Sequence, residues 1–152
     1  KRGFRRNLAN LVEQSILMRE LFSSFDDIAV CNKDDSHGFV TMMRLYPPEL
    51  KDDKRRFKEF TDNSEVGRVF VNDVNRYMKE FFTWDNNNRM SKGMGAEYSF
   101  SSGYMKLDDG SDVSGIKLYP VSPHFNRKYA RQAVNDIVRQ KRYFDKNIWK
   151  KG

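Results

Sequence analysis

The sequence has little cysteine, little proline and no long hydrophobic run. Its 152 residues include one cysteine and four prolines. A single cysteine, Cys31, cannot form an internal disulfide, so we expect a reducing compartment and place the protein in the cytoplasm. Because Cys31 lies in an apolar run, we expect its thiol to be buried. No run approaches the ~18 apolar residues of a membrane span, and no signal peptide is visible, so we expect no membrane partner.

Motifs that carry chemistry are also scarce. The two histidines, His37 and His124, stand in a polar turn and just before a predicted helix, and we interpret both as surface residues. No cysteines and histidines stand at zinc-finger spacing, and Gly93-Met94-Gly95 lacks the remaining residues of a phosphate loop. The acidic pairs Asp26-Asp27 and Asp108-Asp109 fall in turn-like sequence, where carboxylates serve as turn and cap residues. Taken alone, the chain offers no complete catalytic apparatus.

The chain is rich in charge. Charged residues make up 32% of the sequence, and the formal net charge is +7. A positive net charge makes nucleic acid a candidate partner. The positive residues cluster in the segments 1–6, 51–58, 127–142 and 146–151, and acidic residues are interleaved with them in the second and third. Interleaved charge is typical of a solvated exterior. We therefore do not expect nucleic acid as a partner, and keep a basic α/β nucleic-acid-binding module as an alternative function.

The spacing of apolar residues predicts the secondary structure, because steps of three and four indicate helices and alternation indicates strands. The expected elements are a helix over 3–25, strands over 28–31 and 39–46, a short helix within 50–63, a helix over 66–82, strands over 98–104 and 115–119, and a helix over 126–140. Pro47 and Pro48 should end the second strand, and Ser64 and Asn126 should cap helices. The segment 84–88 should break the helical pattern, and 89–97 should form a loop. This order predicts an α+β fold, a two-layer sandwich with a largely antiparallel sheet covered by helices.

The stretch from Tyr98 to Gln140 is the unit around which the rest is expected to pack. Its two strands flank Asp108-Asp109-Gly110, a strong hairpin signal, and the second strand leads into the last helix. Lys117 interrupts that second strand. Alternation places Lys117 and Tyr119 on the side opposite Ile116 and Leu118. Lys117 is then either part of a solvated sheet face or a cation that holds a carboxylate or phosphate.

Several short motifs follow one another in a distinctive order. They are Gly3-Phe4 at the start of the first helix, the strand that ends at Pro47-Pro48, the helix from Val66 to Phe82, Ser101-Ser102-Gly103, the strand from Ile116 to Ser122-Pro123, and the last helix from Asn126 to Gln140. In this order they resemble the C-terminal small domain of the group II pyridoxal-phosphate-dependent amino-acid decarboxylases. That group includes glutamate, aromatic-amino-acid, histidine and 2,4-diaminobutyrate decarboxylases. The resemblance spans nearly the whole chain.

The resemblance implies that the chain is part of a larger, fold-type I enzyme, usually a homodimer. The family's large domain carries the lysine that forms the Schiff base with pyridoxal phosphate, commonly after a histidine. This chain contains no His-Lys pair. We therefore expect residues 1–145 to form a single α+β domain, a C-terminal fragment, followed by a basic tail over 146–152. The expected partners are the large pyridoxal-phosphate-binding domain of the same polypeptide, the amino-acid substrate and a second copy of the enzyme. The fragment alone is expected to bind no cofactor and to lack activity.

The resemblance also implies the substrate-binding residues. In glutamate decarboxylases an arginine on the penultimate strand grips the substrate carboxylate, and aligning Ser122-Pro123 with the family's Asn-Pro puts Lys117 at that position. Lysine is a point charge and cannot form the bidentate pair of arginine. We expect Lys117, Tyr119 and Ser102 to bind substrate and the domain to help close the active site. The segment Trp84–Glu97 departs from the family's pattern as a long insertion.

Two other functions stay open from the sequence. A nucleic-acid-binding module would stack bases on Tyr98, Phe100 and Tyr104. The same aromatic residues alternate along a predicted strand, which equally well places them in a core. An oligomerisation module would carry no chemistry at all.

Overall fold

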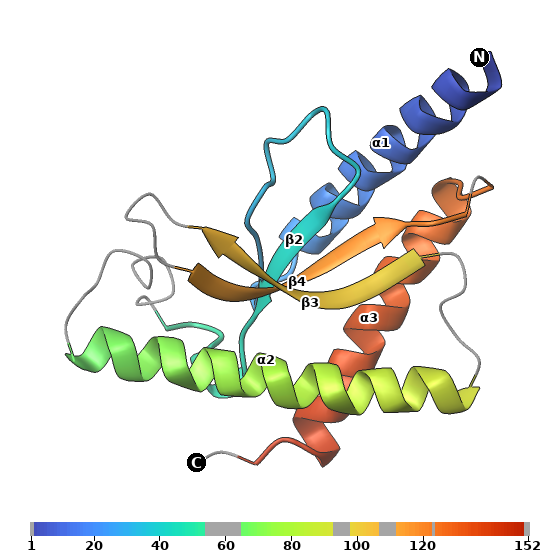
Figure 1. Cartoon of the computed structure of the whole chain (residues 1–152). Helices are drawn as coiled ribbons and strands as arrows, with labels where there is room; N and C mark the ends of the chain where they lie inside the picture. The colour runs from blue at the N-terminus through green and yellow to red at the C-terminus, as the bar shows by residue number, and fades with distance from the viewer. Residues whose placement is uncertain (1, 54–64, 93–97, 107–111, 123, 151–152) are drawn as a thin grey trace.

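The computed structural model describes residues 2–53, 65–92, 98–106, 112–122 and 124–150, which form three helices and a four-stranded sheet (Figure 1). The elements are α1 (Arg2–Ser23), β1 (Ile28–Val30), β2 (Thr41–Leu45), a short 3-10 helix η1 (Pro48–Leu50), α2 (Glu65–Lys92), β3 (Tyr98–Lys106), β4 (Asp112–Pro120) and α3 (Arg127–Asn147). The strands lie in the order β1-β2-β4-β3, and every neighbouring pair is antiparallel. The predicted α+β class, with helices over an antiparallel sheet, is confirmed.

Both predicted strand pairs form. Strand β1 pairs with β2 from Ile28 opposite Leu45, which confirms the first hairpin. Strand β3 pairs with β4 from Tyr98 opposite Pro120, and both strands are longer than predicted. Their predicted turn, Asp108-Asp109-Gly110, lies outside the described residues. Strand β2 joins the two pairs because it also pairs with β4.

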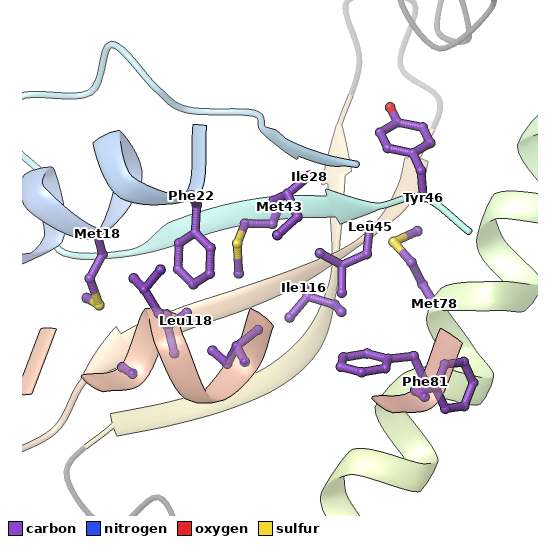
Figure 2. Close-up of a cluster of buried hydrophobic side chains, with 14 of the residues drawn as sticks. Met18, Phe22, Ile28, Met43, Leu45, Tyr46, Met78, Phe81, Ile116 and Leu118 are labelled. Atoms are coloured by element: carbon purple, nitrogen blue, oxygen red, sulfur yellow. The ribbon is translucent and has the colours of Figure 1, made fainter. Parts of the chain in front are cut away.

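One face of the sheet carries the core, and all three helices contribute to it. Met43 on β2 stands opposite Ile116 on β4, so these two side chains share a face. Figure 2 shows both among the buried side chains, with Phe22 of α1 and Phe81 of α2 on the helical side. From α3, the core includes the following buried residues: Ala130, Ala133, Val134, Ile137 and Phe144. The fold therefore has two layers, a sheet and a helical layer.

Helix α2 continues well beyond the predicted end at Phe82. The expected break at Trp84–Asn88 is wrong, and so is the loop over 89–92, because the helix runs to Lys92. The rest of the predicted loop, 93–97, lies outside the described residues. The reason is packing: the Trp84 ring stacks on Tyr143 at 5.7 Å and lies 5.5 Å from the Phe144 ring, while Asp85 is fully buried. These contacts outweigh the weak helix propensity of the asparagines that follow. The predicted cap at Ser64 and the predicted short helix within 50–63 concern residues mostly outside the described part of the chain.

Helix α3 begins at its predicted cap. The Asn126 side chain accepts a hydrogen bond from the Tyr129 amide at 3.0 Å. The helix extends past the predicted end at Gln140, because Lys141 and Phe144 continue its buried face.

The predicted basic tail, 146–152, is partly packed structure. Lys146 belongs to the last turn of α3. The Trp149 ring meets Tyr77 edge-on at 5.0 Å, and its indole N–H donates to Glu49 at 3.0 Å. These contacts fix the chain beyond α3 against α2 and η1.

The loop between β1 and β2 is tied to α1. The fully buried guanidinium of Arg19 donates to the backbone oxygens of Asp35, Gly38 and Val40 at 2.6, 3.2 and 2.9 Å. Cys31, at the start of this loop, is exposed, so the expectation of a buried thiol is wrong. The reason is that β1 ends one residue earlier, at Val30. Over the described residues, no helix combines the length and apolar character needed to cross a bilayer.

Candidate functional site

Lys117 lies on β4, between two neighbouring strands. It stands opposite Met42 of β2 and Ser101 of β3. A strand paired on both sides has a rigid backbone, so Lys117 projects from a fixed point. Its stem crosses Gly103, where a Cβ atom would come within 2.6 Å of the Lys117 Cε. Glycine at 103 therefore leaves room for the lysine to lie along the sheet.

Tyr119 shares the face of Lys117, as alternation predicted. It stands opposite Ser99, and both Lys117 and Tyr119 are half-buried. We use the name Lys117 strip for five residues of this face on β3 and β4: Ser99, Ser101, Gly103, Lys117 and Tyr119. The strip offers one ammonium group and several hydroxyls, and none of its members is acidic. Such a set can hold a carboxylate or phosphate by charge and hydrogen bonds. It contains no nucleophile paired with a base.

Ser102, the third predicted substrate-binding residue, lies on the other face of the sheet. It stands opposite Ile116, whose side chain belongs to the core. Ser102 lines a cavity of about 580 Å³ between α2 and the β3–β4 pair, and neither Lys117 nor Tyr119 lines it. The structure thus brings Lys117 and Tyr119 together and separates Ser102 from them by the thickness of the sheet.

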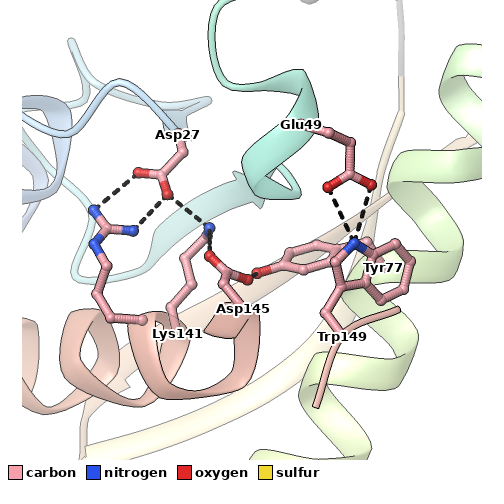
Figure 3. Close-up of polar contacts among 7 residues, drawn as sticks. Asp27, Glu49, Tyr77, Lys141, Asp145 and Trp149 are labelled. Carbon is pink, nitrogen blue, oxygen red and sulfur yellow. Dashed lines mark hydrogen bonds and ion pairs between the residues drawn. The ribbon is translucent and has the colours of Figure 1, made fainter. Parts of the chain in front are cut away.

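Sequence reasoning missed a buried polar network, formed by Asp27, Tyr77, Lys141, Arg142 and Asp145 (Figure 3). The fully buried Lys141 donates to Asp27 and to Asp145, at 2.7 Å each. Arg142 grips Asp27 with two nitrogens, at 2.5 and 3.2 Å, and the Tyr77 hydroxyl donates to Asp145. The network joins α3 to α2 and to the residue before β1. The sequence does contain one indication of this network. Lys141 lies four residues after Ile137 and three before Phe144, which places a lysine on the apolar face of the last helix.

The two carboxylates of the network differ in their pKa. Burial alone would raise the pKa of Asp27, but the hydrogen bonds and charges of Arg142 and Lys141 outweigh burial and hold that pKa below its ordinary value. At Asp145 burial prevails, so its pKa is raised in spite of the charge of Lys141. Burial and the Asp145 carboxylate raise the pKa of Tyr77, so its hydroxyl stays protonated and donates. Each polar group of the network has a hydrogen-bond or ion-pair partner within it, which is typical of a network that stabilises the fold.

No group of His, Cys, Asp and Glu side chains suited to a metal ion occurs within the described ranges. His37 and His124 are both exposed, as predicted. The fold and the site therefore define an α+β domain with a helical layer on one sheet face and a lysine-bearing strip on the other. Compared with known proteins, the chain matches no family model, no curated protein and no solved structure.

Proposed function

We propose that the chain is the C-terminal small domain of a pyridoxal-phosphate-dependent amino-acid decarboxylase, in which Lys117 binds the substrate carboxylate. One observation carries the proposal: Lys117 projects from a doubly paired strand on the sheet face opposite the helical core, beside Tyr119. The order of sequence motifs supplies the family. The placement of Lys117 supports a cation held in a fixed position, which substrate orientation requires.

The two-layer architecture supports a role as one part of an assembly. All three helices contribute to the core on one sheet face. The opposite face carries the half-buried Lys117 and Tyr119, and such a face can dock against another domain. In the proposal, that domain is the large domain of the same polypeptide, and the whole enzyme is a cytoplasmic homodimer.

The residues of this chain suit the substrate of such an enzyme and not its cofactor. The Lys117 strip offers one ammonium and hydroxyls, which suit a carboxylate, and the chain has no His-Lys pair for a Schiff base. We therefore assign the cofactor to the large domain, where it supplies an electron sink when bound. Lys117 pairs with the carboxylate, Tyr119 can donate a hydrogen bond beside it, and docking of the sheet face excludes water. Ser102 cannot reach the same carboxylate, because it lies across the sheet.

Two of the three aromatic residues that a nucleic-acid-binding module would use for stacking are packed against the protein. Tyr98 is only 8% exposed, and the Phe100 ring lies 6.5 and 5.9 Å from Phe81 and Phe82. Tyr104 is 70% exposed, but one aromatic side chain does not make a platform for successive bases. We propose no nucleic-acid function.

The complete polypeptide that contains this chain tests the proposal. We expect its coding sequence to place a large domain with a His-Lys step before Lys1. The purified polypeptide, supplied with pyridoxal phosphate, should release carbon dioxide from at least one amino acid of the acidic, aromatic, histidine or diaminobutyrate classes. A polypeptide that has no such domain, or that decarboxylates none of these classes, contradicts the proposal.

A further inference from the structure

The cavity between α2 and the β3–β4 pair has an apolar interior and a polar mouth. Its volume is about 580 Å³, within the range of ~300–1,000 Å³ common for small-molecule sites. Met78 and Ile116, which are 3% and 1% exposed, form the interior with the half-buried Phe82. The exposed side chains of Lys79 and Ser102 stand at the mouth. A ligand in this cavity would thus meet apolar surface at one end and polar groups at the other.

The groups at the mouth are suited to an anion. None of the cavity's described lining residues is an aspartate or a glutamate. In the described part of the chain, neither the Lys79 ammonium nor the hydroxyls of Ser102 and Tyr104 pair with another side chain. These groups are therefore available to an incoming carboxylate.

Arg76 also lines the cavity, but its guanidinium contacts two other side chains. Its guanidinium lies 4.2 Å from the centre of the Trp149 ring and 3.5 Å from a Glu80 carboxylate oxygen. Lys79 is thus the lining cation that has no acidic partner among the described residues.

We propose that this cavity binds an organic anion with an apolar body, of the class of medium-chain or aryl carboxylates. The body packs on Met78, Phe82 and Ile116, and the carboxylate meets Lys79 and the Ser102 hydroxyl. Burial of the apolar body supplies the affinity, and the charge-assisted contact sets the orientation. This site is independent of the decarboxylase proposal, because Lys117 lies across the sheet.

Titration of the 152-residue chain with octanoate, followed by calorimetry and by methyl NMR of Met78 and Ile116, tests the site. We expect saturable one-to-one binding that shifts both methyl signals. Octan-1-ol has the same chain and no charge, and should bind at least about tenfold more weakly, since contacts to charged groups account for that difference. Acetate, which has the charge and no apolar body, should not bind.

Variants separate the two halves of the site. Lys79→Gln should weaken octanoate binding about tenfold and leave octan-1-ol binding unchanged. Ser102→Phe, which fills the mouth with a residue suited to strands, should abolish binding of both. Lys128→Gln, an exposed lysine on α3, is the matched control and should bind octanoate as the parent does. Equal affinity for octanoate and octan-1-ol, undiminished binding by Lys79→Gln, or shifts confined to other residues would overturn the proposal.

Discussion

The ammonium nitrogen of Lys141 lies 2.7 Å from a carboxylate oxygen of Asp27, although 114 residues separate the two in sequence. Lys141 is fully buried, and Asp27 is nearly so. This contact fixes the last helix to the residue that precedes the first strand. It therefore joins two segments that are far apart in the sequence through a pair of buried charges.

Replacing Lys141 should be costly. Lys141→Met retains most of the volume of the side chain but leaves two buried carboxylates without their shared cation. We expect the free energy of unfolding to fall by about 3–5 kcal/mol, because breaking a buried ion pair leaves uncompensated charge. Urea unfolding of the 152-residue chain measures this loss. Lys128→Met, at an exposed position on the same helix, should change stability by no more than about 0.5 kcal/mol. Equal stability of the Lys141→Met variant and the parent would show that the network contributes nothing.

The opposite pKa shifts of Asp27 and Asp145 predict opposite effects on stability in acid. The pKa of Asp27 is lowered by folding, so its contribution is fully present above about pH 5 and is lost as the pH falls through the folded-state pKa. The pKa of Asp145 is raised, so the folded state takes up this proton first and gains stability relative to the unfolded state as the pH falls.

Unfolding free energies measured from pH 7 to pH 3 check both signs. Asp27→Asn should flatten the decline of stability in acid, and Asp145→Asn should steepen it. Each variant is compared with the parent for its slope against pH, so a uniform loss of stability does not affect the result. Identical slopes for Asp27→Asn and the parent would refute the assignment for Asp27.

Arg19 should govern the order of the loop between β1 and β2. Arg19→Met removes three hydrogen bonds to backbone oxygens of residues 35–40. We expect a loss of about 1.5–3 kcal/mol and faster amide hydrogen exchange at Gly38, whose amide now bonds to Asp35 at 2.9 Å. Arg131→Met, at an exposed arginine on α3, is the control. Unchanged exchange at Gly38 in Arg19→Met would contradict this role.

Local patterns in the sequence were sufficient to predict most of the elements. Apolar periodicity predicted the helices, alternation predicted the shared face of Lys117 and Tyr119, and a side chain with cap chemistry, Asn126, marked the start of α3. Each of these features depends on residues a few positions apart. The same was not true of the C-terminal half of α2, where distant contacts of Trp84 override a run of asparagines.

The candidate site was only partly predicted, because Ser102 was assigned from the resemblance and not from alternation. Lys117 stands opposite Ser101, which puts Ser102 on the other face. Alternation along β3 gives the same placement, since Ser102 shares a face with Tyr98 and Phe100, which pack in the core. The Asp27–Lys141 contact was unpredictable, since it requires knowing which two distant segments meet.

The most direct test of the central claim is the steady-state kinetics of Lys117→Met in the intact decarboxylase that we propose. Lys117→Met keeps the stem over Gly103 and removes the charge that should bind the substrate carboxylate. We predict a fall of about tenfold or more in kcat/KM, the value of one charge-assisted hydrogen bond, while Lys128→Met retains the parental value. Unchanged kcat/KM in Lys117→Met would contradict the account, since Lys117 would then not contact the substrate.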